Sequence, residues 1–414
     1  MSARWQELRL GDLGQVYTGR TPPTERLEYY GDDFPFITPG DMRQGKYALT
    51  TERSLSPEGA ELLQRICLPP NSVCVSCIGW QMGEVIMTNR PSFTNQQINT
   101  IVPDEHVDAD FLYYAMKPRK QELLALGAST GVRTPILNKS AFCKLKILLP
   151  PITLQRKIAG ILSAYDELIA NNQRRIAVLE QMARALYREW FVYFRAPGVV
   201  MIAGEELPEG WEVQKLGAIA DIRKGLSYKG EFLDDVDGKP MVNLKCITPG
   251  GGFRRDGVKG YTGPFKEHQA VRPGDIVFAN TDLTQAGFII GSAAIVPRLG
   301  FEDGGLATHH ICIAHEKAGV ASKCFLYFTL NDERFREFAR GRASGTTVLG
   351  FRTSDAEDFE VQLPPTQMME RFTAVVQPIL DLIETLAEKT ASLRRTRDLL
   401  LPRLMSGRVE IMNP

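Results

Sequence analysis

The sequence lacks the features of a membrane protein, a metalloprotein or a disulfide-stabilised protein. It has no run of 18 apolar residues, and its first ten residues contain no apolar signal segment. Its seven cysteines are an odd number, and most lie in apolar, strand-like segments. Cys74 and Cys77 have no second cysteine pair or spaced histidines to complete a zinc site. We therefore expect a soluble, cytoplasmic protein with buried reduced thiols, no bound metal and no membrane contact.

A net charge is also lacking. The sequence has 49 Lys and Arg against 49 Asp and Glu, which argues against a protein that holds nucleic acid by bulk charge alone. Local basic surfaces are still compatible with this balance, because phosphate binding depends on where the basic side chains lie. The 414 residues, 43% of them hydrophobic, are enough for two or three domains with their own cores.

The motifs of common enzymes are missing as well. Gly40 to Lys46 fits most of a phosphate-binding loop, but Tyr47 replaces the Ser or Thr that holds magnesium. We find no Ser-His-Asp signature, no dinucleotide-binding GxGxxG and no Asn/Asp-Pro-Pro-Tyr/Phe run of an amino-methyltransferase. The sequence therefore favours a binding protein over an enzyme, with no catalytic residue to name.

The chain instead contains a long internal repeat. The segment from Trp5 to Gly19 recurs from Trp211 to Gly225, and Leu149-Pro-Pro recurs as Leu363-Pro-Pro, at an offset of roughly 210 residues. This period is too long for a solenoid and indicates a duplicated domain with the segment that follows it. We place globular domains at 1–150 and 198–365, and helical regions at 151–197 and 366–414. Short β-like runs mixed with helical segments make each globular domain α+β.

Each Leu-Pro-Pro is followed by a segment with helical periodicity. The prolines end the preceding strand, and Thr153 and Thr366 are predicted helix N-caps. Apolar residues then recur in heptads, as in a coiled coil. The predicted seam consists of Ile158, Leu162, Tyr165, Ile169, Asn172, Ile176, Leu179 and Leu186 in the first helix, and Phe372, Val376, Ile379, Ile383, Leu386, Leu393 and Leu400 in the second. The two seams bury each other, or each pairs with another protein.

Polar and basic loops recur at similar places in both halves. Arg and Lys pair with phosphate or guanine, Asn and Gln with adenine, and Ser and Thr with either. The alternative is that these are ordinary solvated loops. Trp80, for its part, is either a contact in a DNA groove or a core residue. The candidates for DNA binding are Thr18, Arg20, Thr21, Arg43, Lys46, Trp80, Gln81, Asn89, Arg90, Ser129, Thr130 and Arg133 in the first half, and Lys224, Lys229, Lys245, Asn280, Thr281, Gln285, Arg342, Ser344, Thr346, Thr347 and Arg352 in the second.

The histidine pair His309-His310 aligns with Gln96-Gln97 of the first half. A metal-binding or catalytic histidine rarely aligns with glutamine in a duplicated domain. This favours a structural or polar-contact role for the pair.

The architecture resembles the specificity (S) subunit of type I restriction–modification enzymes over essentially the whole chain. The motifs that carry the resemblance are Leu149-Pro-Pro-Ile-Thr-Leu-Gln-Arg-Lys-Ile-Ala159, Ala185-Leu-Tyr-Arg-Glu-Trp-Phe-Val-Tyr-Phe194 and Leu399-Leu-Leu-Pro-Arg-Leu-Met-Ser-Gly407. The segment after Leu363-Pro-Pro departs from the pattern, because it lacks the Gln-Arg pair of the first half.

The resemblance implies a non-catalytic DNA-recognition subunit. Each globular domain would read one half of a split target in double-stranded DNA, and the two helices would pack as an antiparallel coiled coil that sets the spacer. The helices would dock two modification (methyltransferase) subunits, which would bind S-adenosylmethionine. A restriction subunit would bind ATP and Mg, and this chain would bind no cofactor. The alternatives are a non-catalytic two-headed scaffold that binds protein partners, and a self-contained DNA-modifying enzyme.

Overall fold

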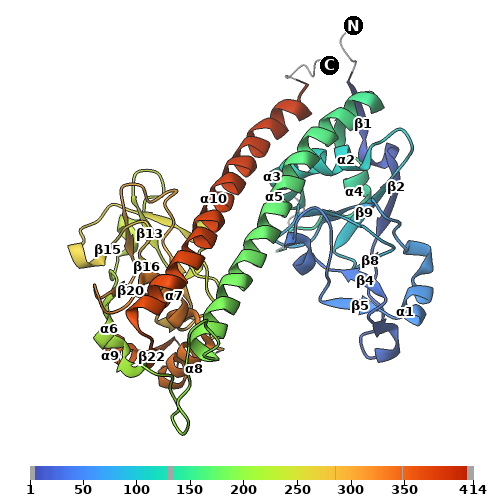
Figure 1. The fold of residues 1–414 in the computed structure, drawn as a ribbon. Helices are drawn as coiled ribbons and strands as arrows, with labels where there is room; N and C mark the ends of the chain where they lie inside the picture. Colours follow the sequence, from blue (N-terminus) through green and yellow to red (C-terminus); the bar gives the residue numbers. More distant parts are fainter. Residues whose placement is uncertain (1–4, 129–133, 285, 347, 408–414) are drawn as a thin grey trace. The chain divides into compact units, whose positions relative to one another are not determined.

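The computed structural model describes residues 5–128, 134–284, 286–346 and 348–407 (Figure 1). The chain divides into two compact units. Unit 1 comprises residues 1–172 and 390–414, and unit 2 comprises residues 173–389. Each unit therefore combines one globular domain with one part of each of two long helices.

The globular part of unit 1 is built on two four-stranded sheets. The first has the order β2-β9-β6-β7 and the second β3-β5-β4-β8, while β1 pairs with β10 beside the long helices. The strands are β1 (Gln6–Arg9), β2 (Gly14–Thr18), β3 (Tyr30–Gly31), β4 (Phe34–Ile37), β5 (Arg53–Leu55), β6 (Val73–Ser76), β7 (Val85–Met87), β8 (Phe93–Thr94), β9 (Ile98–Pro103) and β10 (Lys146–Leu149). The short helices are α1 (Pro57–Leu62), α2 (Ala109–Met116), α3 (Lys120–Ala128) and α4 (Lys139–Cys143).

The globular part of unit 2 is also built on two four-stranded sheets. Its four-stranded sheets have the orders β12-β20-β16-β18 and β14-β13-β19-β15, and β11 pairs with β22 as β1 does with β10. The strands are β11 (Glu212–Lys215), β12 (Ala220–Lys224), β13 (Lys239–Val242), β14 (Lys259–Tyr261), β15 (Ala270–Val271), β16 (Ile276–Ala279), β17 (Thr281–Asp282), β18 (Ala293–Ile295), β19 (Gly305–Ala307), β20 (Ile311–Glu316), β21 (Leu349–Gly350) and β22 (Glu360–Leu363). The short helices are α6 (Leu216–Ile219), α7 (Lys323–Asn331), α8 (Glu333–Arg342) and α9 (Thr353–Glu357). The first sheet and the small pair therefore repeat in topology. The second sheets share three strands, but the fourth strand pairs with β5 in unit 1 (β3) and with β19, the counterpart of β8, in unit 2 (β15).

The two long helices are α5 (Ile152–Tyr187, 36 residues) and α10 (Thr366–Met405, 40 residues). A π-helical turn at Arg188–Val192 extends α5. The predicted N-caps Thr153 and Thr366 are wrong, because both threonines lie inside the first turn. Pro151 and Pro365 precede the helices, and their carbonyl oxygens accept hydrogen bonds from the backbone N–H groups four residues on, at 3.0 Å and 3.3 Å. A proline has no N–H to satisfy, so this position suits it.

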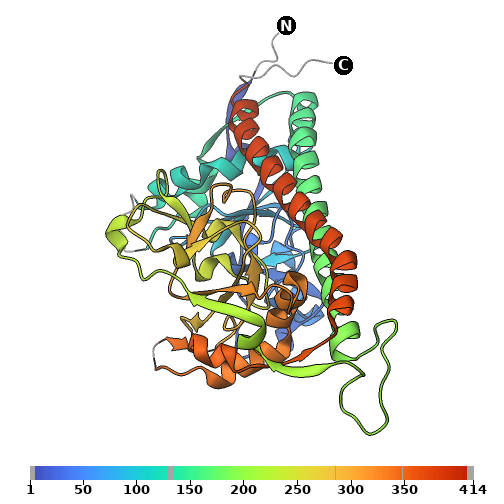
Figure 2. The ribbon, with the colours of Figure 1, turned by 60° about the vertical axis from the view of Figure 1, so that its left-hand side comes forward.

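The start of α5 and the end of α10 pack together in unit 1. Ile158 and Leu162 share a buried core with Leu404 of α10 and with Phe111 of the globular domain. Leu400 packs against the same core, and the end of α10 returns to lie beside β1 (Figures 1 and 2). Burying an aliphatic or aromatic side chain of this size contributes about 1.5–3 kcal/mol.

The end of α5 and the start of α10 pack together in unit 2. The rings of Phe191 and Phe372 lie 4.9 Å apart, and both belong to the core that holds Tyr187 and Val376. The two helices are therefore antiparallel, and each predicted seam residue is buried or half-buried. Seam residues also pack against the globular domains, so they are buried by a domain as well as by the other helix.

Most cysteine side chains are buried, as the sequence predicts. Burial raises the pKa of the Cys74, Cys77 and Cys312 thiols to about 12, and of the Cys246 and Cys324 thiols to about 11. A thiol with a raised pKa forms little nucleophilic thiolate near neutral pH. We expect iodoacetamide at pH 8 to modify the native chain only at the half-buried Cys67 and Cys143. Peptide mass mapping before and after denaturation checks this, and rapid native labelling of any buried thiol would contradict it.

Candidate nucleic-acid interface

Several loops of unit 1 meet at one edge of the sheet β2-β9-β6-β7. β2 and β6 end at this edge, at Thr18 and Ser76, and β9 begins there at Ile98, as the pairs Thr18–Asn99 and Ser76–Ile98 show. Antiparallel neighbours alternate in direction, so the chain leaves and re-enters the sheet at this edge. We call it loop edge 1. It consists of the loop after β2, the β6–β7 turn and the turn before β9.

The polar side chains of loop edge 1 are held mainly by one another. Thr18 Oγ1 donates to Asn99 Oδ1 at 2.6 Å, and Thr21 Oγ1 donates to Gln96 Oε1 at 2.7 Å. Arg20 is exposed between the two threonines. Hydroxyl, amide and guanidinium groups of this kind can pair with base edges and phosphates.

A repeated glycine shapes the first loop of each edge. A Cβ atom on Gly19 would lie 2.2 Å from the backbone oxygen of Asn95, and one on Gly225 would lie 2.3 Å from that of Ala307. No side chain fits such a close approach of two backbones. The glycine that ends the repeated sequence segment is therefore required in both units for the same steric reason.

Trp80 and Gln81 lie at the turn between β6 and β7, on loop edge 1. The Trp80 side chain is 72% exposed, so it is not a core residue. The loop that follows α3 also reaches this edge, because Gly79 N–H donates to the oxygen of Pro135 at 2.9 Å and Ile78 forms a bridge with Ile136. The sequence candidates Ser129, Thr130 and Arg133 lie outside the described residues.

Unit 2 has the corresponding edge on the sheet β12-β20-β16-β18. β12 ends at Lys224, β16 ends at Ala279 and β20 begins at Ile311, as the pairs Lys224–Cys312 and Ala279–Ile311 show. We call this loop edge 2. It consists of the loop after β12, the segment between β16 and β18, and the turn before β20.

Loop edge 2 brings together Lys224, Thr281 and the two histidines. His310 Nδ1 and Thr281 Oγ1 form a hydrogen bond of 2.8 Å, and the His309 and His310 rings are 3.8 Å apart. Burial, followed by the neighbouring positive charges that include Lys224, lowers the pKa of both histidines below its ordinary value. Both rings are therefore neutral at pH 7, and His310 makes the polar contact that the sequence favoured. Asn280 is buried beside Thr281.

The loop that follows α8 also reaches loop edge 2. β17 pairs with β21 through Thr281–Gly350, and Ser344 forms a bridge with Gly350. The exposed Arg342 and Thr346 flank Ser344, and Arg342 stacks over Phe338 at 4.8 Å. The exposed Arg352 follows at the start of α9. Gln285 and Thr347 lie outside the described residues.

Two other sequence candidates, Asn89 and Arg90, lie away from loop edge 1. Asn89 and Arg90 follow the end of β7, and β7 runs away from loop edge 1, so both are at the opposite edge of the sheet. Arg43, Lys229 and Lys245 are exposed on or beside short 3₁₀ segments. Lys229 lies at the end of the loop after β12, which belongs to loop edge 2, and is 3.7 Å from Glu231.

Lys46 is buried between the globular domain and α5, not exposed on a loop. Its Nζ lies 2.9 Å from Asp110 and donates to Ser163 Oγ of α5 at 2.9 Å, and its side chain is 12% exposed. It also lies over the Tyr47 and Tyr114 rings at 5.5 Å. The sequence candidate for DNA contact is thus engaged inside unit 1, and its role there is to join the domain to the helix.

A buried polar cluster joins the globular part of unit 1 to both long helices. Tyr114 donates to Asp166 of α5 at 2.6 Å, and Arg397 of α10 pairs with the same carboxylate at 2.5 Å. Burial, reinforced by Asp166, raises the pKa of Tyr114 far above its ordinary value, so its hydroxyl remains a donor. One carboxylate therefore ties together three elements.

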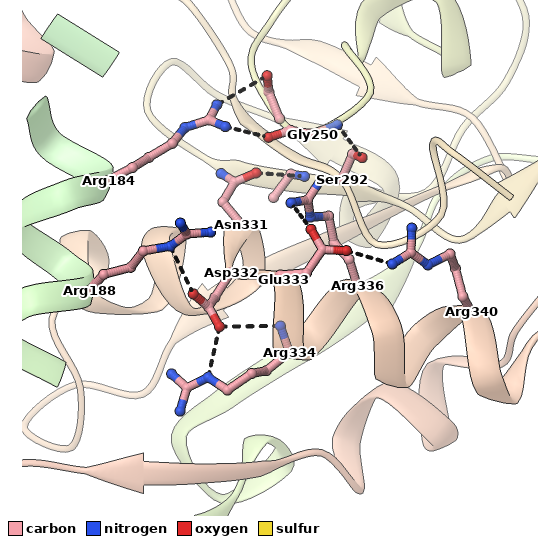
Figure 3. Close-up of polar contacts among 12 residues, drawn as sticks. Arg184, Arg188, Gly250, Ser292, Asn331, Asp332, Glu333, Arg334, Arg336 and Arg340 are labelled. Carbon is pink, nitrogen blue, oxygen red and sulfur yellow. Dashed lines mark hydrogen bonds and ion pairs between the residues drawn. The ribbon is translucent and has the colours of Figure 1, made fainter. Parts of the chain in front are cut away.

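A second polar cluster joins α5 to the globular part of unit 2 (Figure 3). Arg184 donates to the backbone oxygen of Gly250 at 2.7 Å, and Arg188 lies 3.9 Å from Asp332. Asp332 caps α8, has a side chain only 6% exposed, and also pairs with Arg334 at 2.7 Å. Charge-assisted hydrogen bonds of this kind are directional, so they fix the orientation of α5 against the domain.

The described part of the chain holds no group of three or more His, Cys, Asp or Glu side chains placed to bind a metal ion. Among the same residues, no helix is both long and apolar enough to cross a membrane.

Each unit thus has a globular part, here called a head, that carries one loop edge and packs on antiparallel segments of α5 and α10. Residues 3–181 match the family described as type I restriction modification DNA specificity domain. The chain is 26% identical over 423 residues to the type I restriction enzyme MjaIX specificity subunit of Methanocaldococcus jannaschii. This alignment covers 98% of this chain and 94% of that protein.

A second relative matches one part of the chain more strongly. The type I restriction enzyme HindI specificity subunit of Haemophilus influenzae is 39% identical over 173 residues, which is 41% of this chain and 37% of that protein. Among solved structures, the S subunit of a type I restriction-modification system from M. genitalium has the same fold, with a TM-score of 0.58 at 15% identity over 99% of this chain and 97% of that one. The chain is thus similar to type I restriction enzyme specificity subunits, over nearly its whole length in the first relative and over one part of it in the second.

Proposed function

We propose that the chain is the DNA sequence-recognition subunit of a type I restriction–modification complex. Each unit reads one half of a bipartite target in double-stranded DNA with its loop edge. The observation that carries this proposal is the repeated edge itself, where polar side chains from loops far apart in the sequence gather on the same sheet in both units. Loops on a rigid scaffold are the usual place for binding residues.

The proposed partners supply the chemistry. Two modification subunits dock on the paired helices and bind S-adenosylmethionine, and restriction subunits that join through the complex bind ATP and Mg. The chain itself binds no cofactor, catalyses no step and works in the cytoplasm. Its own contribution is to hold two loop edges on helices that polar clusters fix to each head. A fixed helical spacer sets the number of unread base pairs between the half-sites.

Mapping methylated bases in the host genome, with and without this gene, tests the proposal. We expect one split sequence to lose its methylation when the gene is removed. Loss of an undivided sequence, or of none, would contradict the proposal.

Arginine and lysine variants test the role of the loop edges. We expect Arg20→Ala and Lys224→Ala each to weaken binding of the mapped duplex about tenfold, and to reduce the salt slope of log affinity by about one if the side chain contacts a phosphate. Arg90→Ala, which lies on the same sheet as Arg20 but at its opposite edge, is the matched control and should bind like the wild type. An equal loss of affinity for the duplex in Arg20→Ala and Arg90→Ala would show that loop edge 1 is not the DNA-binding surface. Binding that hardly changes with salt would favour the protein-binding scaffold instead.

A further inference from the structure

The hairpins at the two loop edges present large apolar side chains to solvent. Trp80, between β6 and β7, is 72% exposed. Leu283 and Phe288, between β16 and β18, are 63% and 67% exposed. These two connections occupy the same place in the topology, since each joins the last two strands of the sheet that carries a loop edge. The repeat therefore preserves an exposed apolar tip although the loops differ in length and sequence.

The unit 1 tip is held by a fixed turn. Gly83 N–H donates to the oxygen of Ser76 at 2.9 Å, and Ser76 Oγ donates to the oxygen of Gln81 at 3.1 Å and accepts from Glu84 N–H at 3.0 Å. Met82 is fully buried beneath the turn. The backbone that carries Trp80 is therefore bonded on both sides, and the exposed ring lies on an anchored turn.

The unit 2 tip is fixed by a buried carboxylate. Asp282 is 4% exposed and accepts hydrogen bonds from Thr284 N–H at 2.6 Å, Thr284 Oγ1 at 2.7 Å and Ile289 N–H at 3.1 Å. Leu283 and Phe288 lie just inside the two ends of this bonded segment. The carboxylate thus organises the loop so that both apolar side chains face water.

The surroundings of the tips indicate which partner covers them. Each tip is small and bordered by polar groups, such as the exposed Gln81 beside Trp80 and the exposed Thr284 beside Leu283. A protein partner generally covers a broader apolar patch. Duplex DNA offers the complementary surface, because its edges and backbone are polar while the gaps between stacked base pairs accept apolar side chains.

We infer that the two hairpin tips insert Trp80, and Leu283 or Phe288, between base pairs of the two half-sites, so that each head unstacks one base step. This inference rests on the proposed function. Insertion makes each head sensitive to how easily a base step opens, and pyrimidine–purine steps open most easily. Each half-site would then contain a position selected for deformability without a hydrogen bond to a base edge.

Fluorescent base analogues test the insertion directly. The probe is a duplex of the mapped sequence with 2-aminopurine or pyrrolocytosine placed at one position at a time, mixed with the complex of the full chain and its modification subunits. We expect fluorescence to rise at one step in each half-site. Trp80→Ala should abolish the rise in one half-site only and lower affinity roughly tenfold or more. The double variant Leu283→Ala with Phe288→Ala should do the same in the other.

Matched variants separate insertion from a general loss of apolar surface. Leu148→Ala on β10 and Val213→Ala on β11 remove exposed apolar side chains from the small sheets beside the long helices, and should change nothing. Trp80→Phe should keep the fluorescence rise.

Three results would overturn the inference while leaving the proposed function intact. They are specific binding with no unstacked step, an unchanged signal in Trp80→Ala, and a Trp80→Ala defect confined to assembly with the modification subunits. Failure of the wild-type complex to prefer the mapped duplex would instead refute the proposed function.

Discussion

Deleting one heptad from each long helix, residues 172–178 of α5 and 385–391 of α10, should shorten the unread spacer by about three base pairs. Seven residues span roughly 10.5 Å of helix, and DNA advances about 3.4 Å per base pair. The contacts Asp166–Arg397 in unit 1 and Phe191–Phe372 in unit 2 have the same antiparallel register, so the two deletions remove matched lengths of helix between them. The deletion removes about two turns from both helices. It also removes the exposed ion pair between Glu388 and Arg298 of unit 2, but it keeps the Asp166–Arg397 and Phe191–Phe372 contacts.

Deleting residues 172–178 from α5 alone is the contrasting variant. This deletion shifts α5 against α10 by a heptad. The Asp166–Arg397 contact in unit 1 can then form only if the Phe191–Phe372 contact in unit 2 is broken, and the reverse also holds. We expect loss of assembly rather than a new spacing. Genome-wide methylation mapping reads out both variants, and the half-site sequences should stay unchanged in the paired deletion. An unchanged spacer in the paired deletion would show that the helices do not set the distance between half-sites.

The duplication and the helices could be predicted because they depend on local pattern. The Leu-Pro-Pro repeat marks where each globular domain ends, and heptad periodicity identifies α5 and α10 to within a turn. The helix starts were misplaced because threonine is a strong N-cap, whereas here Pro151 and Pro365 occupy that position. Local propensity identifies an element more reliably than its boundary.

The candidate interface was less predictable because it depends on strand direction. Arg20 and Arg90 look alike in the sequence, yet the antiparallel order of β2, β9, β6 and β7 puts them at opposite edges. Lys46 resembles a loop cation, but its partner Ser163 is 117 residues away on α5. Pairings over such distances leave no mark in local composition.

Replacing Asp166 with alanine should destabilise unit 1 by about 2 kcal/mol. The Asp166 side chain is 17% exposed and the Arg397 side chain 24% exposed, so the substitution leaves a largely buried guanidinium and the Tyr114 hydroxyl without this acceptor. Removing one partner of a buried pair costs more than the pair itself contributes. Arg397 keeps Asp398 as a second partner, which limits the loss. For a unit of this size, we expect the midpoint of its unfolding transition to fall by roughly 4–8 °C in calorimetry.

Two further variants give this result its meaning for recognition. Asp166→Leu combined with Arg397→Met should recover most of the stability, because a well-packed apolar pair often equals a buried ion pair. Asp398→Ala, which removes an exposed partner of the same arginine, should stay close to the wild type. If the polar cluster orients the head of unit 1, the complex with the stable double variant should methylate DNA, but at sites whose spacer differs from that of the wild type. The reason is that apolar contacts resist rotation less than directional hydrogen bonds. A double variant that is stable and keeps the wild-type spacing would assign the orientation of the head to the apolar core alone.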